Sequence, residues 1–556
     1  MTFPALSNLS ESDPRRRSAI PAYSGKRVQL EFDFNGKVPT LDATALLTLS
    51  HLKILDQTLD AFDTVYIPHS TLGWLFEELQ KATFHQPSRI VIARQVRDML
   101  ATDVLEKFYP STVADSELSA QVGEDLAALI AEAEKEGEGG TTQHVVVRPA
   151  PVYRISSLME EEADLSAHAA VLSSCLAVMD KLKQKAIITA EEVDRASAYL
   201  QMQEKPWPNQ PEIADGATLY LDNLAITYLL HLGLLEKLKA AGLRAVASPK
   251  AVSEANTLLT YNSISDEVKE IIERLRSSLN TRIESGHIRV GRRRNIEKAG
   301  DEAIPEHPTV GISSLTSHCN AAIVDDRSIN QYANMHDGSS EISILCTLDL
   351  LDALVASNVI SGNNWLEYRT RLRRAGYFFV PITKDELERC LRESTVADGN
   401  VVETAELKAI RESLLRVRMS DWLQLPNEAP WLDNTIKTFI HVLRNLWDDG
   451  ADVAQASARS NWLAQHIDIR GWAHSLDPEN ADNIVRTGRG VFLLLLLTAL
   501  TGVQQSIMDA YWNWLEEKIL TPIKEQFPDL YDWLVEWHKD HIDKITKIST
   551  SERDEF

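Results

Sequence analysis

The chain has 556 residues, of which 44% are hydrophobic, and it carries a formal net charge of −24. This length exceeds that of one ordinary domain, and the composition is that of a globular protein with substantial cores. A protein that coats nucleic acid would be basic, so any nucleic-acid contact must be local. The four cysteines form no Cys-x-x-Cys pair, which argues against a zinc site or a disulfide framework and suits a reducing cytosol.

The sequence gives no sign of a targeting segment or of a common nucleotide-binding loop. No apolar stretch follows the polar N-terminus, which argues against a signal peptide. The most apolar run, residues 491–503, is too short to span a bilayer. Neither GxxxxGK[ST] nor GxGxxG occurs. We therefore expect a cytoplasmic protein with no membrane partner.

Taken in chain order, the patterns predict four regions. Residues 1–27, with three prolines and many serines, are expected to be a disordered tail. Strand and helix patterns then alternate over 28–205, beginning with an alternating apolar strand at 28–34. After a proline-rich stretch, a similar order of elements runs over 216–395. From about 400 the pattern is helical, and nine of the twelve tryptophans lie there. This predicts a separate α-helical domain over 400–550.

The second and third regions repeat each other. The segment that begins with Leu41-Asp42 matches the segment that begins with Leu221-Asp222 at an offset of 180 residues. Later positions match at an offset of 172, and this change of offset means that the first copy lacks about one helix and one strand. The sequence therefore predicts two copies of one α/β domain, each with a parallel sheet.

The first copy, over 28–205, is interpreted as degenerate. It lacks the strand that ends in Asp325-Asp326, and it has Gly73 where the second copy has Glu254. It keeps one acid of the pattern, Asp42, and a lone carboxylate organises a divalent cation poorly. We expect Asp42 to cap the helix that follows it.

The second copy contains acids where a parallel sheet would bring them together. Asp222 follows the first strand, Glu254 lies in the helix after the second strand, and Asp325 and Asp326 end the strand at 321–324. Ligand crevices of α/β sheets open at the carboxyl ends of strands. Adjacent carboxylates need a cation or a shifted pKa, and Mg²⁺ or Mn²⁺ prefer carboxylate oxygens. Such a cluster activates water and stabilises displacement at phosphorus.

Five segments, in this order, resemble the PIN-like domain of metal-dependent nucleases: LYLDNLAITYLLHLGLLEKL, VASPKAVSEA, IVDDRSINQYA, CTLDLLDALVASNVIS and LRRAGYFFVPIT. The resemblance is to the toxin-type branch with a late Asp-Asp-Arg motif, and it covers about 216–395 well and 40–203 in degenerate form. It implies two PIN-like α/β/α copies and an endoribonuclease that uses Mg²⁺ or Mn²⁺. Catalysis and metal binding would then fall to these residues: Asp222, Glu254, Asp325 and Asp326.

The same resemblance implies a hydroxyl near the site at Thr347, and it also exposes one departure. PIN-like domains usually carry a further acid on the helix before the late strand. Here that segment reads Glu306-His307-Pro308-Thr309-Val310, so Thr309 fills one expected acidic place. A missing ligand weakens a metal site.

Several basic and polar residues are candidate contacts for a substrate phosphate. Arg327 and Asn330 either hold a phosphate or brace the loop after the late strand. Arg292, Arg293 and Arg294 form a basic cluster on an otherwise acidic chain. The strand-end acids have an alternative reading as helix caps, and the C-terminal tryptophans as core anchors or a protein interface.

The leading hypothesis is a metal-dependent nuclease that cleaves RNA, or less readily single-stranded DNA, in a prokaryotic toxin or defence system. One rival is a catalytically inactive PIN-like scaffold that recruits a partner protein through its helical C-terminal domain. Another is a small-molecule hydrolase that uses the same acids. Because PIN-like domains commonly pair, a homo-oligomer is also expected.

Overall fold

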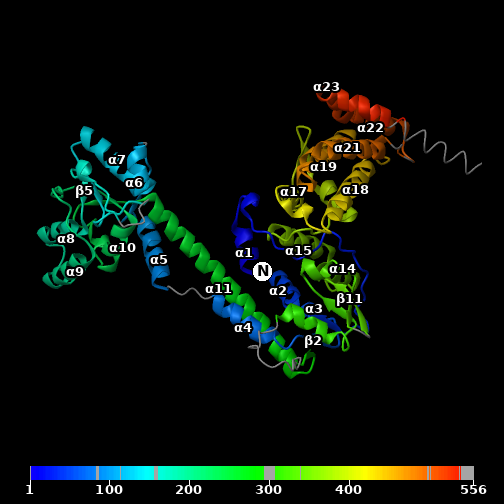
Figure 1. The fold of residues 1–556 in the computed structure, drawn as a ribbon, viewed down its shortest axis with the longest axis horizontal. Coiled ribbons are helices and arrows are strands. Elements are labelled where there is room, and N and C mark those ends of the chain that lie inside the picture. The colour runs from blue at the N-terminus through cyan, green and yellow to red at the C-terminus, as the bar shows by residue number, and fades with distance from the viewer. Residues whose placement is uncertain are drawn as a thin grey trace, which may run out of the picture. The chain divides into compact units, whose positions relative to one another are not determined.

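Two compact units make up the protein in the computed structural model. The structure describes residues 2–82, 87–112, 114–155, 161–292, 307–337, 340–497, 500, 502–537 and 539. The first unit contains Met1–Ala82 and Glu267–Phe556, and the second contains Thr83–Asp266. Each unit has one large sheet of mainly parallel strands accompanied by helices, which confirms the predicted fold class (Figure 1).

The first unit holds a six-stranded sheet of order β10-β11-β9-β1-β2-β8. Its strands are β1 (Pro39–Leu41), β2 (Val65–Ile67), β8 (Ile288–Val290), β9 (Ala321–Ile323), β10 (Asn334–Asp337) and β11 (Ser340–Leu345). All neighbouring strands run parallel except β10 and β11. The central strands β1 and β9 are buried at every residue, as expected for a parallel sheet that is covered on both faces.

Helices precede, connect and follow these strands. They are α1 (Thr2–Ser10), η1 (Pro14–Arg16), α2 (Ala43–Leu52), α3 (Leu55–Asp60), α4 (Thr71–Lys81), the end of α11 (Pro249–Glu284), α12 (Pro308–Gly311), η4 (Ile312–Leu315), α13 (Arg327–Asn330), α14 (Thr347–Ala356), α15 (Gly362–Arg374) and α16 (Lys384–Glu393). Side-chain caps fix where several of them begin. Asp42 caps α2 and Thr383 caps α16, each by accepting from a backbone N–H three residues later.

The second unit holds a five-stranded, entirely parallel sheet of order β3-β7-β6-β4-β5. Its strands are β3 (Glu106–Lys107), β4 (His144–Val147), β5 (Leu172–Ser173), β6 (Thr218–Leu221) and β7 (Arg244–Ala247). The accompanying helices are α5 (Pro87–Ala101), α6 (Ser116–Val122), α7 (Glu124–Gly139), η2 (Ser166–His168), α8 (Cys175–Gln184), α9 (Ala190–Gln203), α10 (Asn223–His231), η3 (Leu235–Lys237) and the start of α11.

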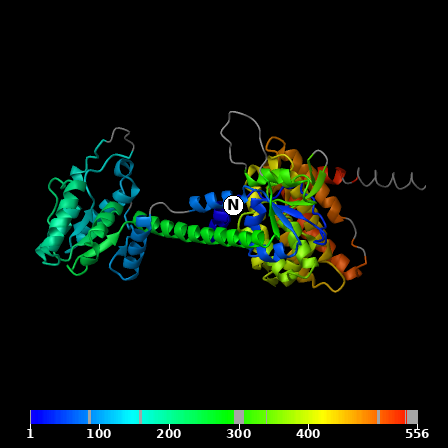
Figure 2. The same ribbon diagram turned by 90° about the horizontal axis from the view of Figure 1, so that it is seen from below.

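The two sheets do not follow the two sequence repeats, which corrects the predicted domain ranges 28–205 and 216–395. Strands β1 and β2 of the first repeat pair with β8 and β9 of the second, whereas β6 and β7 of the second pair with β3 and β4 of the first. Figure 2 shows the blue N-terminal strands beside green strands of the same sheet. Strands β1 and β6 occupy equivalent positions in the two repeats. The repeat pattern alone therefore could not decide whether β9 pairs with β1 or with β6.

Residues 1–27 were predicted to be a disordered tail, and the structure contradicts this. Helix α1 buries Ala5 and Leu6, and the Asn8 side chain donates to the Ala375 carbonyl at 2.7 Å. Gly376, with φ of +97°, leaves room for this contact, because a side chain there would collide with Asn8. The buried apolar side chains and this hydrogen bond order a segment whose prolines and serines predicted disorder.

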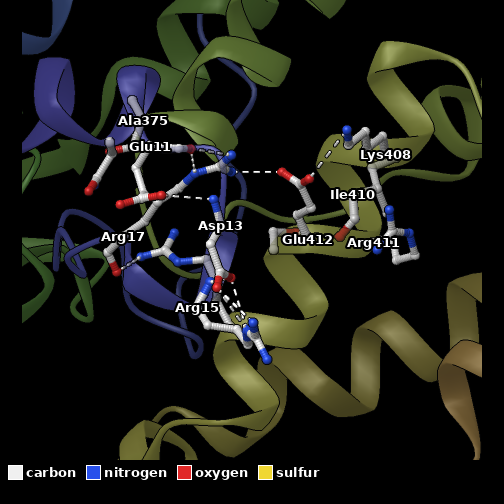
Figure 3. A network of polar contacts seen from close by, with 12 residues as sticks. Glu11, Asp13, Arg15, Arg17, Ala375, Lys408, Ile410, Arg411 and Glu412 are labelled. Atoms are coloured by element: carbon white, nitrogen blue, oxygen red, sulfur yellow. Dashed lines mark hydrogen bonds and ion pairs between the residues drawn. The ribbon is translucent and has the colours of Figure 1, made fainter. Parts of the chain in front are cut away.

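A buried ion pair further anchors this N-terminal segment. Arg17 pairs with Glu412 of helix α17 (Ala405–Arg418) at 2.7 Å, and neither side chain is more than a tenth exposed. Figure 3 shows Arg17 reaching Glu412 while Arg15 turns back to Asp13. The arginine run 15–17 therefore makes structural contacts at both of these positions.

The alternating segment 28–34 was predicted to be a strand but forms none. Phe32 and Phe34 instead pack on Phe62, with ring centroids 6.0 and 5.0 Å away. An extended segment that lays alternate side chains on the protein has the same period of two as a paired strand. The pattern thus predicted the partial burial of Phe32 and Phe34, but it was wrong about strand pairing and about Val28, which is 68% exposed.

The C-terminal region is helical, as predicted, apart from a hairpin of β12 (Thr395–Ala397) and β13 (Asn400–Val402). Its further helices are η5 (Asp421–Gln424), α18 (Ala429–Asn445), α19 (Val453–Ile467), η6 (Ile469–Gly471), α20 (Ala473–Leu476), α21 (Ala481–Leu497), α22 (Gln505–Leu515), the π-helical turn η7 (Glu516–Leu520) and α23 (Thr521–Gln526). Trp431, Trp447, Trp462, Trp472 and Trp514 are buried and serve as core anchors. None of the helices within the described ranges is long and apolar enough to cross a membrane.

A buried ion pair at α16 gives a test of stability. Glu386 accepts from Arg373 at 2.5 Å and from Arg369 at 3.1 Å, and all three side chains are at most 2% exposed. Burial alone would raise the pKa of Glu386, but the two guanidinium groups lower it to about 2. Because the folded-state pKa lies below the unfolded value, this stabilisation is complete above about pH 4.5 and is lost as the pH falls towards 2.

We expect Glu386→Gln to reduce the free energy of unfolding by about 3–5 kcal/mol, since it leaves two buried guanidinium groups without their partner. Urea unfolding at neutral pH measures this loss. The matched control is Glu393→Gln, which removes an exposed pair with Arg389 and is expected to cost less than about 1 kcal/mol. Equal losses in the two variants would contradict the prediction.

Candidate active site

Two aspartates lie together at the carboxyl edge of the six-stranded sheet. Asp42 follows β1 and Asp325 lies just beyond β9, and these strands are in register with Leu41 opposite Ile323. The backbone N–H of Asp42 donates to the Ile323 carbonyl at 3.1 Å, which extends the ladder to the aspartate. Asp42 is 0% and Asp325 is 1% exposed. This edge is where α/β proteins place their ligands.

Three threonine hydroxyl groups hold the two carboxylates. Thr44 donates to Asp42 Oδ2 and accepts from the backbone N–H of Asp325 at 3.2 Å, so that one hydroxyl links both acids. Thr309 Oγ1 donates to Asp42 Oδ2 at 3.1 Å. Thr347 Oγ1 donates to Asp325 Oδ2 at 2.6 Å. Backbone N–H groups of Ala45 and Thr347 donate to the other oxygen of each carboxylate.

Burial changes the acidity of both aspartates. It raises the pKa of Asp42 to about 7, and the nearby charge of Asp325 contributes to this rise against the hydrogen bonds of the Asp42 carboxylate. Burial also raises the pKa of Asp325, although the hydrogen bonds from Thr347 oppose this. A pair of buried, coupled carboxylates with raised pKa values is typical of a functional site.

Residues 20–27, here called the N-terminal strap, pack against this edge. Asn330 fastens the strap, because its side chain donates to the Ala22 carbonyl at 2.7 Å and accepts from the Ser24 N–H at 3.1 Å. Arg27 forms a buried ion pair with Asp349 at the start of α14. Tyr23 is fully buried, and its pKa is raised first by burial and then by the charge of Asp325.

The corresponding edge of the five-stranded sheet pairs an acid with a base. Asp222 follows β6 and Arg148 follows β4, and these strands are neighbours with Leu221 opposite Val147. The Arg148 guanidinium forms an ion pair with the Asp222 carboxylate, and their side chains are 24% and 6% exposed. Burial raises the pKa of Asp222, and the charge of Arg148 opposes this rise. At this edge the Arg148 guanidinium therefore takes the position next to Asp222 in which a metal ion was predicted.

The predicted cluster of four acids is not assembled. Glu254 accepts from the Asn223 side chain at 2.6 Å and lies with Asp222 in the second unit, whereas Asp325 and Asp326 follow β9 in the first. The reason is the exchange of strands, because β6 and β9 belong to different sheets. Across the described ranges, no group of three or more His, Cys, Asp and Glu residues is arranged to hold a metal ion.

Residues 40–108 match the family described as a PIN domain associated with the TPR-GreAB-C-PIN system. The match supports a PIN-like domain in this chain. It begins in β1, two residues before Asp42, and runs through β2 to β3. Because PIN domains are usually nucleases, the match also supports a nuclease scaffold. Searches of curated proteins and of solved structures gave no significant match.

The remaining predicted residues divide into structural and peripheral ones. Asp326 caps α13 by accepting from the Ser328 N–H at 2.8 Å, as the alternative reading had it. Arg327 pairs with Glu428 at 2.6 Å, and Asn330 fastens the strap, so both brace the loop. Arg292 is exposed after β8, while Arg293 and Arg294 lie outside the described residues. Thr347 lies beside Asp325, where the resemblance implied a hydroxyl.

Asp42 is the site residue that the sequence analysis assigned only a capping role. It does cap α2, by accepting from the Ala45 N–H at 2.7 Å, but it also faces the late acid Asp325. The signal was present in the repeat, since Asp42 matches Asp222 at a constant offset. Thr309, predicted to stand in an acidic place, donates to Asp42.

The Arg148–Asp222 pair should matter for stability rather than for chemistry. Arg148→Met would leave the buried Asp222 carboxylate without its cation, and we expect a loss of about 2–3 kcal/mol in the free energy of unfolding. Thermal or urea unfolding measures this. The double variant Arg148→Met, Asp222→Asn should recover most of the loss, and its failure to do so would show that packing of Arg148, not charge, is responsible.

Proposed function

We propose that this protein is a divalent-metal-dependent PIN-like nuclease, acting on RNA or on single-stranded DNA, whose centre is built on Asp42 and Asp325. The observation that carries the proposal is the meeting of two buried carboxylates from neighbouring parallel strands at a sheet edge. The match of residues 40–108 to a PIN family supports it independently.

The residues at this edge fit Mg²⁺ or Mn²⁺ in their chemistry. The donors are oxygen atoms only, and Mg²⁺ is commonly held by one or two carboxylates together with water and substrate phosphates. Asp42 and Asp325 would hold the ion, with Thr309 standing where a further acid would be expected. When bound, such an ion lowers the pKa of water and neutralises charge that develops on a phosphate.

The side chains around the carboxylates would orient and protect this centre. Thr347 and Thr44 keep the two carboxylates facing each other. The Thr48 hydroxyl lies 3.2 Å from the Tyr377 hydroxyl, and its hydrogen bond to Asp325 opposes the rise that burial causes in the pKa of that carboxyl. Since Asp42 and Asp325 are buried, a nucleic acid would reach the centre only after the residues that cover them move.

The test is cleavage of a mixed panel of RNA and single-stranded DNA by the full chain. We expect cleavage with Mg²⁺ or Mn²⁺, none with a chelator, and none by Asp325→Asn. Cleavage that persists in the chelator or in Asp325→Asn would contradict the proposal, as would a wild-type protein that neither cleaves the panel nor changes its melting temperature with either ion.

A second candidate is a catalytically inactive PIN-like scaffold that recruits a partner protein through its helical C-terminal region. The favouring observation is that both carboxylates are buried and already hydrogen-bonded to threonine hydroxyls. The family description associates its PIN domain with a TPR-GreAB-C-PIN system, and this association with TPR supports a protein partner. No ion-dependent change in melting temperature would favour this candidate.

A further inference from the structure

A cavity of about 320 Å³ lies among the helices of the C-terminal region and shares no residue with either sheet edge. Residues of α18, α19, η6, α21, η7 and α23 line it. Small-molecule sites have volumes of about 300–1,000 Å³ and mainly apolar walls. Here the walls include Ile440, Phe492 and Ile519, and one wall is the π-helical turn η7, a feature often found at functional sites.

The charged groups of this cavity are predominantly basic. Four basic residues and two acidic ones line it: Lys437, Arg470, Arg489, Lys518, Asp433 and Asp468. One of the acids is already engaged, because Arg470 donates from Nε to Asp468 at 2.8 Å. The excess of basic over acidic residues in its lining favours an anionic ligand.

Arg489 lines this cavity and has only a long ion pair, to Asp468. Its side chain is 7% exposed, and its Nη2 lies 3.6 Å from Asp468 Oδ1, beyond hydrogen-bond length. Its Nη1 is buried with no hydrogen-bond partner among the residues that the structure describes. On its other side the guanidinium lies 5.3 Å from the Phe527 ring centroid. A buried cation without a full set of partners is costly, and an anion supplied from outside would remove that cost.

We infer that this cavity binds a small amphipathic carboxylate, with the carboxylate on Arg489 Nη1 and an aliphatic body along the apolar walls. A carboxylate matches the planar guanidinium and carries a single charge. A phosphate ester carries more charge than a carboxylate and needs further donors besides the buried Nη1 group of Arg489. This inference does not depend on the proposed nuclease activity.

Isothermal titration calorimetry on the full chain tests it with decanoate, decanol and decyl phosphate, each below its micellar concentration. Decanoate is expected to bind the wild type. Arg489→Gln should weaken decanoate binding about tenfold or more, as for the loss of one charged hydrogen bond, and leave decanol binding unchanged. Arg470→Gln, which removes a partly exposed arginine of the same cavity, is the matched control and should weaken decanoate less.

A second variant separates ligand binding from folding. Ala464→Phe would fill the cavity, and it should abolish binding of both decanoate and decanol while circular dichroism shows the helices retained. The inference is overturned if decanoate does not bind the wild type, if Arg489→Gln binds it equally well, or if decyl phosphate binds more tightly than decanoate.

Discussion

Asn substitution at Asp42 or at Asp325 is expected to reduce metal-dependent cleavage by about 100-fold or more, whereas Asp222→Asn is expected to leave it within a few-fold of wild type. A metal ion contributes several kcal/mol to stabilising charge on a transferring phosphoryl group, and each 1.36 kcal/mol changes a rate about tenfold. Asp42 and Asp325 extend from paired strands, while Asp222 is already neutralised by Arg148. Initial rates on one labelled RNA, with the ion at saturation, measure the three effects.

This comparison also tests the strand exchange between the repeats. If β6 paired with β9 in solution, Asp222 and Glu254 would join Asp325, and Asp42 would be left with Arg148. The variants would then behave in the opposite way, with Asp222→Asn inactive and Asp42→Asn active. Glu254→Gln is the matched control, because it is expected to be silent under the observed pairing and damaging under the alternative.

The sequence predicted the local elements of the site better than their assembly. Strand ends and the helix cap at Asp42 are encoded within a few neighbouring residues. Asp326 was assigned to the acid cluster, with a helix cap as the alternative, and it caps α13. The hydroxyl of Thr347 lies 22 positions from Asp325 and was implied only by the resemblance. Which strand lies beside which is a non-local property. Two repeats with equivalent strands provide two sets of partners of similar hydrophobicity. The apolar pattern of each strand is therefore compatible with pairing within its own repeat and with pairing between the repeats.

Besides the strand pairing, the sequence could not predict which charged group lies next to each acid. Asp42 and Asp222 occupy equivalent positions in the repeats, yet one faces a carboxylate and the other faces a guanidinium. The sequence offered no reason to pair Arg148 with Asp222, because the two residues are 74 positions apart. The ordered structure of residues 1–27 was also not predictable from nearby residues, since it depends on contacts with residues more than 300 positions away.

The free energy of unfolding of the first unit is expected to fall as the pH rises from about 4 to 7, by up to about 4 kcal/mol, because of Asp42. Its pKa is about 7 in the folded protein against 3.8 for the ordinary side chain. Between these values the unfolded chain loses the proton and the folded protein keeps it, so the unfolded state binds fewer protons and stability decreases with pH. Each unit of pKa difference corresponds to about 1.36 kcal/mol.

Asp42→Asn should remove this slope and make the protein more stable than wild type at pH 8, while abolishing cleavage. An amide has no charge to desolvate, and its oxygen can still accept from the Ala45 N–H that Asp42 caps. Urea unfolding of both proteins at several pH values between 4 and 8 measures the difference. Asp63→Asn, at an exposed aspartate near β2, controls for a general effect of removing one negative charge. If the slope survived in Asp42→Asn, a group other than Asp42 would be responsible for it, and the prediction would be wrong. A gain in stability that accompanies a loss of activity would instead mean that the chain keeps a costly buried carboxylate for its function.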